Sequence, residues 1–226
     1  MKVGVLLPTF EVGAKRAFAA AARASATGFD GVFAYDHLWP MGSPQRPALA
    51  PFPVLASVGA RYPSLCLGPL VARVGLVSTD HLVTAFRTLE ALAPHRVLAA
   101  IGTGDRLSAQ ENAAYGVPEL DATARRQLLG ETARALVPIM SVWIGAGAPA
   151  TNALAREVGA TVNLWNASAA SVREAAQDGP VSWAGPAPAS EVTSRLLDDL
   201  ASAGATWAVF GDGVDADVVA GWRSAN

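Results

Sequence analysis

The stretch Gly28–Trp39, GFDGVFAYDHLW, decides the fold class of this chain. A glycine that can end a helix precedes a short apolar strand, and the strand runs directly into Asp36, His37 and Trp39. Carboxylate, imidazole and indole are side chains that binding sites use. In parallel sheets with helical crossovers, ligands bind at the carboxyl ends of the strands. The stretch therefore predicts an α/β architecture and the face of it on which a site lies.

The same alternation of strand and helix continues in both directions along the chain. Apolar strand-like runs lie at 3–7, 32–35, 65–71, 97–101, 141–144, 161–165, 181–184 and 206–210. Helical spacing follows at 14–26, 54–61, 82–92, 122–137, 150–158, 169–176, 192–203 and 214–222. Continuous apolar strands are typical of a sheet buried on both faces. Eight strand–helix units predict a (β/α)8 TIM barrel that forms a single domain over residues 1–226. An open doubly wound sheet is the alternative, because the pattern does not reveal closure.

Composition limits the kind of partner and the compartment. The 226 residues carry a formal net charge of −2, which gives no general attraction to nucleic acid or to an anionic membrane. Cys66 is the only cysteine, which favours a reducing compartment. The apolar start of the chain is too short for a signal peptide, and no apolar run is long enough for a membrane helix. We therefore expect a soluble, cytoplasmic protein.

Asp36 and His37 are the first candidates for catalysis. An imidazole can take up and release a proton near neutral pH, and the end of a strand would deliver it into the barrel mouth. The structural alternative is that His37 only braces the loop while Asp36 bonds to backbone amides. His81 and His95 are at no spacing from His37 that is typical of a metal site, so no metal is expected.

Two long loops follow strands on the same predicted face, at 36–53 and 102–118. The second begins with a glycine-rich turn in which Thr103 offers a hydroxyl. Arg73 and Arg106 follow strands and are candidates for contact with an anionic ligand, although solvated arginine is the simpler interpretation.

A second glycine turn, Gly145–Ala148, lies between a strand and a helix that begins with a proline. Free amides at a helix start bind phosphate, and glycine allows the phosphate to come close. Gly145, Gly147 and Ala150 also fit the loose dinucleotide pattern, but the strand at 163–166 lacks the acidic residue that this pattern expects. The turn therefore favours a phosphate site over a nicotinamide reductase.

Taken in order, five segments resemble the bacterial luciferase-like monooxygenase family. These segments are GFDGVFAYDHLW (28–39), LCLGPLVARVGL (65–76), ALAPHRVLAAIGTGD (91–105), ENAAYGVP (111–118) and VWIGAGAPATNALAREVGATVN (142–163). The resemblance implies a TIM barrel and an oxidoreductase or monooxygenase that uses FMN or the deazaflavin coenzyme F-420 on a small-molecule substrate. The deazaflavin is slightly favoured. The resemblance also implies a homodimer.

The resemblance also implies roles for single positions. Asp36 and His37 match a motif whose histidine lies near the cofactor ring. Val71–Ala72 matches the place of a non-prolyl cis peptide behind the ring, and Thr103 matches a contact to the ring edge. The turn of Gly145, Ala146, Gly147 and Ala148 matches the phosphate site.

One feature departs from the family. Residues 137–141 join a helix directly to the next strand, where the family usually has an insertion that covers the barrel mouth. This implies an open site, and it keeps a non-catalytic flavin-type binding protein as the alternative function.

Overall fold

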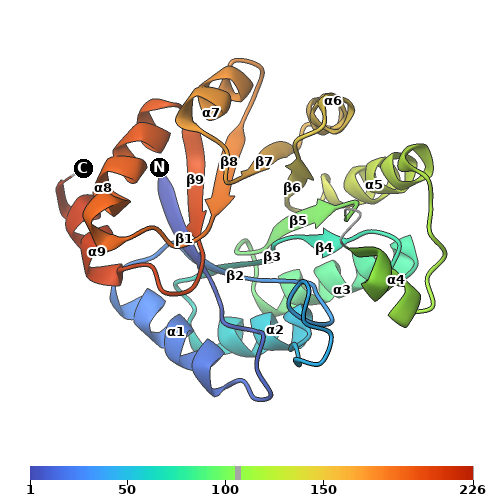
Figure 1. The fold of residues 1–226 in the computed structure, drawn as a ribbon, viewed down its shortest axis with the longest axis horizontal. Coiled ribbons are helices and arrows are strands. Elements are labelled where there is room, and N and C mark those ends of the chain that lie inside the picture. The colour runs from blue at the N-terminus through green and yellow to red at the C-terminus, as the bar shows by residue number, and fades with distance from the viewer. Residues whose placement is uncertain (105–107, 226) are drawn as a thin grey trace.

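Strands and helices alternate along the computed structural model, which describes residues 1–104 and 108–225. Figure 1 shows the helices surrounding a central set of strands. The strands are β1 (Lys2–Leu6), β2 (Gly31–Ala34), β3 (Cys66–Pro69), β4 (Ala72–Arg73), β5 (Leu98–Gly102), β6 (Ser141–Ala146), β7 (Thr161–Trp165), β8 (Val181–Gly185) and β9 (Ala205–Phe210). The helices are α1 (Lys15–Ala26), α2 (Pro51–Arg61), α3 (Thr79–Leu92), α4 (Ala109–Ala114), α5 (Ala122–Leu136), α6 (Pro149–Glu157), α7 (Ala169–Ala176), α8 (Ser190–Ser202) and α9 (Ala216–Ala225).

The strands form one parallel sheet that curls into a barrel. Its order is β3-β2-β1-β9-β8-β7-β6-β5-β4, so β3 and β4 stand at its two ends. A parallel bridge from Leu67 in β3 to Val97, the residue before β5, closes the barrel, and the Leu67 amide donates to the Arg96 carbonyl at 2.7 Å. β3 lies within the strand expected at 65–71, and β4 begins just after residue 71, so the two short strands together occupy one barrel position. The predicted (β/α)8 barrel is confirmed, and the open sheet is wrong.

The break between β3 and β4 is a feature that the sequence pattern did not predict. A non-prolyl cis peptide joins Leu70 to Val71 at this point. The resemblance implied such a bond at Val71–Ala72, so the observed bond lies one position earlier.

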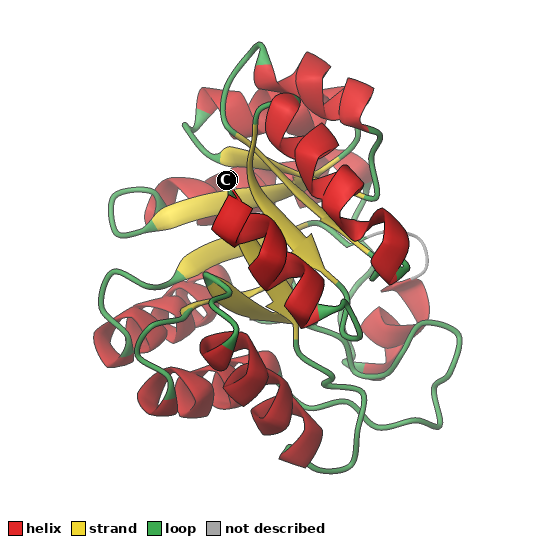
Figure 2. Ribbon diagram, turned by 90° about the vertical axis from the view of Figure 1, so that its left-hand side faces the viewer, coloured by secondary structure: helices red, strands yellow, loops and turns green. Residues whose placement is uncertain are grey.

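Two apolar layers hold the barrel together. The inner layer fills the barrel with three aromatic rings, in which Phe33 stacks on Trp143 at 5.4 Å and Trp207 lies edge-on to Phe33 at 5.8 Å between centroids. Gly4 makes room for them, since a Cβ there would lie 2.7 Å from the Phe33 ring. The outer layer lies between the sheet and the helices, which Figure 2 shows on the outside of the strands. Large rings inside thus require glycine in the strands.

Several helix boundaries follow from local chemistry. Helix α2 begins at Pro51, three residues before the predicted start, because proline is accommodated in the first turn of a helix. The Asp121 carboxylate caps α5 by accepting from the amides of Thr123 and Ala124. Helix α4 lies within the loop expected at 102–118 and was not predicted. In the described part of the chain, no helix combines the length and the apolar character needed to cross a bilayer.

Candidate functional site

A cavity of about 630 Å³ opens at the carboxyl ends of the strands. This volume is typical of small-molecule and cofactor sites. The residues that line it belong to the ends of strands β4, β5, β6 and β7 or to the segments after β1, β2, β3, β5 and β6. They are Phe10, Tyr35, His37, Met41, Leu70, Val71, Arg73, Gly102, Thr103, Gly104, Ser108, Gly145, Ala146, Gly147, Ala148, Thr151, Asn163 and Trp165. The long loops and the glycine turns therefore meet at one place, as expected for a barrel of this kind.

Most of the candidate residues from the sequence line this cavity. His37, Val71, Thr103 and the whole turn Gly145–Ala148 do so. Asp36 and Ala72 are not among the lining residues. Ala72 is fully buried in the outer apolar layer. Their predicted roles at the site remain predictions.

Val71 forms part of the cavity lining between two strand ends. A Cβ added at Gly102 would lie 2.6 Å from Val71 Cγ2, and one at Gly145 would lie 3.1 Å from Val71 Cγ1. Both glycines therefore leave space that the valine side chain fills. Val71 therefore presents an apolar side chain to the cavity between the two glycines.

The turn Gly145–Ala148 leads into α6, whose N-terminus is not capped by a side chain. Ala148 holds the N-cap position, and Pro149 follows as the first helical residue. The first amides of a helix generally have no acceptor within the helix and carry its positive dipole end. In α6, Pro149 has no N–H, and the Thr151 amide donates to the Ala148 carbonyl at 3.0 Å. A Cβ at Gly147 would meet nothing within 4 Å, so the space beside this turn is open.

Aromatic side chains form another wall of the cavity. Phe10 stacks on Tyr35 with centroids 5.3 Å apart, and Trp165 lies edge-on to Tyr35 at 6.3 Å. His37 stands 6.3 Å from the Tyr35 ring. Burial, with the Asp212 carboxylate adding to it, raises the pKa of Tyr35 to about 12. The phenol therefore keeps its proton at neutral pH and can donate a hydrogen bond.

Glu111 on α4 is the centre of a buried polar cluster beside His37. One carboxylate oxygen accepts from the amides of Leu38 and Trp39 at 2.9 and 3.3 Å. The other lies 2.9 Å from His37 Nδ1 and 2.9 Å from Arg73 Nη2. The Glu111 side chain is 3% exposed, and the His37 side chain is 22% exposed. This carboxylate thus ties α4 to the loop after β2.

Asp36 braces the same cluster from the other side. Its carboxylate accepts from the backbone amide of Arg73 at 3.0 Å, as the structural alternative for this residue expected. Burial raises the pKa of Asp36 above its ordinary value, while the amide and the guanidinium of Arg73 oppose that rise. The carboxylate thus links the end of β2 to β4.

Arg73 and Arg106 were the two arginines considered as contacts for an anionic ligand, and the structure describes only Arg73. Arg73 is 4% exposed and its guanidinium pairs with Glu111, so it is not the solvated arginine of the simpler interpretation. Arg106 lies outside the described residues. Among the cavity-lining residues that the structure describes, Arg73 is the one arginine or lysine.

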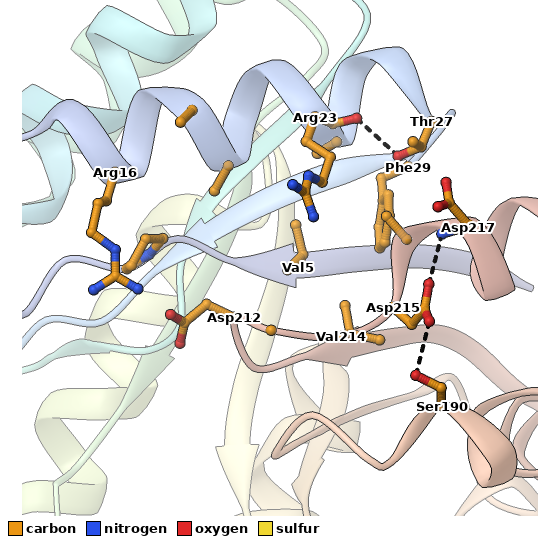
Figure 3. A pocket seen from close by; sticks show the side chains of 16 residues that line it. Val5, Arg16, Arg23, Thr27, Phe29, Ser190, Asp212, Val214, Asp215 and Asp217 are labelled. Carbon is orange, nitrogen blue, oxygen red and sulfur yellow. Dashed lines mark hydrogen bonds between the residues drawn. The ribbon is translucent and has the colours of Figure 1, made fainter.

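A larger hollow of about 780 Å³ lies elsewhere, between α1 and the segment that precedes α9 (Figure 3). Arg16 and Arg23 on α1 face this segment, which carries Asp212 and Asp215. Asp215 already accepts hydrogen bonds from the Ser190 hydroxyl and from amides at the start of α9. None of the candidate residues from the sequence lines this hollow. The candidate residues from the sequence therefore gather at the barrel mouth and not at this hollow.

Sequence reasoning did not identify Glu111. The residue begins the segment ENAAYGVP, which carried part of the family resemblance, but nothing in its neighbourhood along the chain marks it as buried. It lies 74 positions from His37. Only the fold brings the two together.

The structure is that of an α/β-barrel protein with a cavity at the carboxyl ends of its strands. The chain belongs to the luciferase-like monooxygenase family, whose sequence model matches residues 1–141. The resemblance seen in the sequence is confirmed.

Two relatives illustrate the similarity in sequence. An F420-dependent glucose-6-phosphate dehydrogenase of Intrasporangium calvum is 35% identical over 121 residues, which cover 52% of this chain and 36% of that protein. An F420-dependent hydroxymycolic acid dehydrogenase of Mycobacterium tuberculosis is 33% identical over 109 residues, or 48% of this chain and 30% of that protein. The matched part of the chain thus spans about a third of the length of these relatives.

Solved structures extend the likeness over nearly the whole chain. An F420-dependent secondary alcohol dehydrogenase in complex with an F420–acetone adduct has a TM-score of 0.80 and 12% identity, covering 98% of this chain and 97% of its own. A monooxygenase from Streptomyces bottropensis has a TM-score of 0.69 and 16% identity, covering 99% of this chain and 97% of its own. At these identities the likeness shows the fold.

Proposed function

We propose that this protein is a flavin- or deazaflavin-dependent oxidoreductase that acts on a small molecule at the barrel mouth. The observation that carries the proposal is the single cavity that joins His37, the Val71 surface and the turn Gly145–Ala148. Val71 offers a surface for a ring, the turn Gly145–Ala148 offers amides for a phosphate, and His37 offers a group for proton transfer. Family membership supports the same chemistry.

The residues present suit a flavin-type cofactor. Val71 and its two flanking glycines offer an apolar surface for a ring, and Tyr35 and Trp165 offer aromatic edges. The open space at Gly147 and the uncapped start of α6 suit a phosphate held by amides rather than by cations. Thr103 lines the same cavity, and its hydroxyl donates to the Gly104 carbonyl at 3.1 Å. A bound flavin or deazaflavin would supply the hydride chemistry that protein side chains lack.

The protein's own part is binding, orientation and proton transfer. His37 would accept a proton from a substrate hydroxyl or return one to a carbonyl oxygen. The Glu111 cluster would keep the loop that carries His37 in place. The aromatic wall of Phe10, Tyr35 and Trp165 would exclude water from one side of the reacting atoms.

The deazaflavin is the cofactor that we favour, and an alcohol is the substrate class. Relatives in sequence are F420-dependent dehydrogenases. A structural relative over nearly the whole chain is an F420-dependent secondary alcohol dehydrogenase. FMN is the second choice, since a riboflavin lyase with modified FMN shares the fold at a TM-score of 0.68.

A turnover assay tests this function. The purified protein is mixed with the oxidised deazaflavin and either 2-propanol or glucose 6-phosphate, and loss of the cofactor's visible absorbance is followed. His37→Ala should lower turnover by about 10²–10⁴-fold while changing the cofactor dissociation constant by less than about threefold. Equal turnover by wild type and His37→Ala would remove His37 from the mechanism. Binding of the cofactor with no turnover on a panel of alcohols would favour the alternative, a non-catalytic binding protein.

Dimerisation and a cytoplasmic location belong to the proposal as well. Size-exclusion chromatography with light scattering measures the first, and we expect a mass of twice 23.2 kDa. A monomer at working concentration would refute the homodimer without touching the cofactor proposal.

A further inference from the structure

We propose that Glu111 is a positioning residue, which holds neutral His37 in the tautomer that carries its proton on Nδ1 and leaves Nε2 as the acceptor in the cavity. The functional half of this inference rests on the proposed oxidoreductase activity. The structural half concerns the protein without cofactor.

Among the described residues, the groups in direct contact with the Glu111 carboxylate are His37 and three obligatory donors. Oε1 lies 2.9 Å from the Leu38 amide and 3.3 Å from the Trp39 amide, and Oε2 lies 2.9 Å from Arg73 Nη2. Amides and guanidinium groups keep their protons at any ordinary pH. The carboxylate therefore acts as an ionised acceptor, and it has no proton to offer to its fourth neighbour.

His37 Nδ1 is that fourth neighbour, at 2.9 Å from Oε2. Facing an acceptor, Nδ1 carries the ring proton in the neutral imidazole. The lone pair then resides on Nε2, for which no hydrogen-bond partner is found in the described part of the chain. His37 lines the cavity, so Nε2 is the ring nitrogen available to a ligand there.

The contact between Glu111 Oε2 and His37 Nδ1 also stabilises His37 after the imidazole has accepted a proton. The O–H bond of a substrate hydroxyl breaks, an N–H bond forms at Nε2, and the imidazolium that results faces the Glu111 carboxylate across Nδ1. A buried carboxylate in this position orients the ring and stabilises its charged form. The other ionisable groups around the cluster are Asp36, Arg73 and Tyr115. Arg73 forms an ion pair with Glu111.

Glu111→Gln separates this role from a merely structural one. The glutamine oxygen still accepts from the amides of Leu38 and Trp39, so the loop keeps its anchor. Its NH2 group faces Nδ1 and can only donate, which reverses the tautomer and places the ring proton on Nε2. The same group faces Arg73 Nη2, so the variant also loses the ion pair with Arg73, and the tautomer is the readout specific to His37. Glu131→Gln on α5 is the matched control, because it makes the same chemical change at an exposed position.

The tautomer is read by nitrogen-15 NMR of the imidazole rings in cofactor-free protein. The chain has three histidines, and His81 and His95 are exposed and serve as internal references. We expect His37 to show the Nδ1–H form in wild type and in Glu131→Gln, and the Nε2–H form in Glu111→Gln. An Nε2–H form of His37 in wild type would overturn the inference, even if Glu111→Gln did not fold.

Kinetics test the functional half. With the deazaflavin and 2-propanol, kcat of Glu111→Gln should fall by about 10²–10⁴-fold, with KM and the cofactor dissociation constant within about threefold of wild type. A reversed tautomer with unchanged kcat would refute the functional half. If wild type itself shows no turnover, the proposed activity fails, while the NMR result still decides what Glu111 does to His37.

Discussion

A methyl group at Gly102 should disturb the cavity surface, whereas the same methyl at Gly147 should not disturb the protein at all. Both glycines line the cavity, and neither has a positive φ. They differ in what a Cβ would meet. At Gly102 it would lie 2.6 Å from Val71 Cγ2, and at Gly147 it would meet nothing within 4 Å.

The size of the effect follows from that distance. Ordinary van der Waals contact begins at 3.4 Å, so Val71 has to move by about 0.8 Å in Gly102→Ala. Valine is stiff about χ1 and has little rotamer freedom with which to escape. Overpacking of this kind costs about 1–3 kcal/mol. For a chain of this length the melting temperature should fall by about 2–4 °C per kcal/mol, which is roughly 2–12 °C in total.

Calorimetry and a cofactor titration together give the assay. Gly102→Ala should melt lower than wild type and bind the cofactor more weakly, because the surface under the ring has shifted. Gly147→Ala should melt within about 1 °C of wild type. It should nevertheless bind the cofactor at least about tenfold more weakly, because its methyl fills space beside the phosphate turn. Unchanged stability in Gly102→Ala, or unchanged affinity in Gly147→Ala, would refute this reasoning.

Three further predictions concern ionisable groups. The pKa of Tyr35 is raised to about 12, so the free energy of unfolding should fall as pH rises from 10 towards 12. In denaturant titrations over this pH range, the free energy of unfolding of Tyr35→Phe should fall less than that of wild type. The pKa of Asp36 is raised above 3.8, so the folded state binds its proton more tightly than the unfolded chain, and unfolding free energy falls as pH rises through the raised value. Asp36→Asn should flatten this fall, and parallel pH profiles of variant and wild type would contradict it. Asp30 accepts from the buried Val3 amide at 2.8 Å and pairs with Arg223 on α9. In urea unfolding, Arg223→Ala should lower the free energy of unfolding by about 1 kcal/mol. Asp30→Ala should lower it by about 1–3 kcal/mol more, because this change also leaves the Val3 amide without its acceptor. A larger loss in Arg223→Ala than in Asp30→Ala would refute this prediction.

The repeating units of the barrel were predictable because their signals are local. Each unit consists of an apolar run of four to six residues followed by helical spacing and a glycine. All parts of this pattern lie next to one another in the sequence. The end of α1 shows this, where Gly28 takes a positive φ of 77° just before β2. The glycine turn before α6 was equally visible, since Gly145–Ala148 and Pro149 are adjacent in the chain.

Features that depend on contacts between distant segments were not predictable. The strand expected at 65–71 breaks at Leu70–Val71, where the Val71 side chain fills the space left by Gly102 and Gly145. Nothing in the apolar pattern of that strand marks the break. Helix α4 is short, and it is held by the contacts of Glu111 with the loop after β2. Such elements depend on the completed fold more than on their own propensity.

The same distinction between local and distant signals applies to the candidate site. His37 and Thr103 were predicted at the barrel mouth because each follows a strand, and both line the cavity. Glu111 and the buried state of Arg73 were missed, because a charged residue is exposed by default unless its partner is known. Here each of the two is the partner of the other.

We propose that the barrel mouth holds a flavin-type cofactor. A titration of the purified protein with the deazaflavin and, separately, with FMN, followed by fluorescence, tests this proposal. We predict saturable binding of the deazaflavin with a dissociation constant on the order of micromolar, and weaker binding by Gly147→Ala. Failure of folded wild-type protein to bind either cofactor would contradict the account.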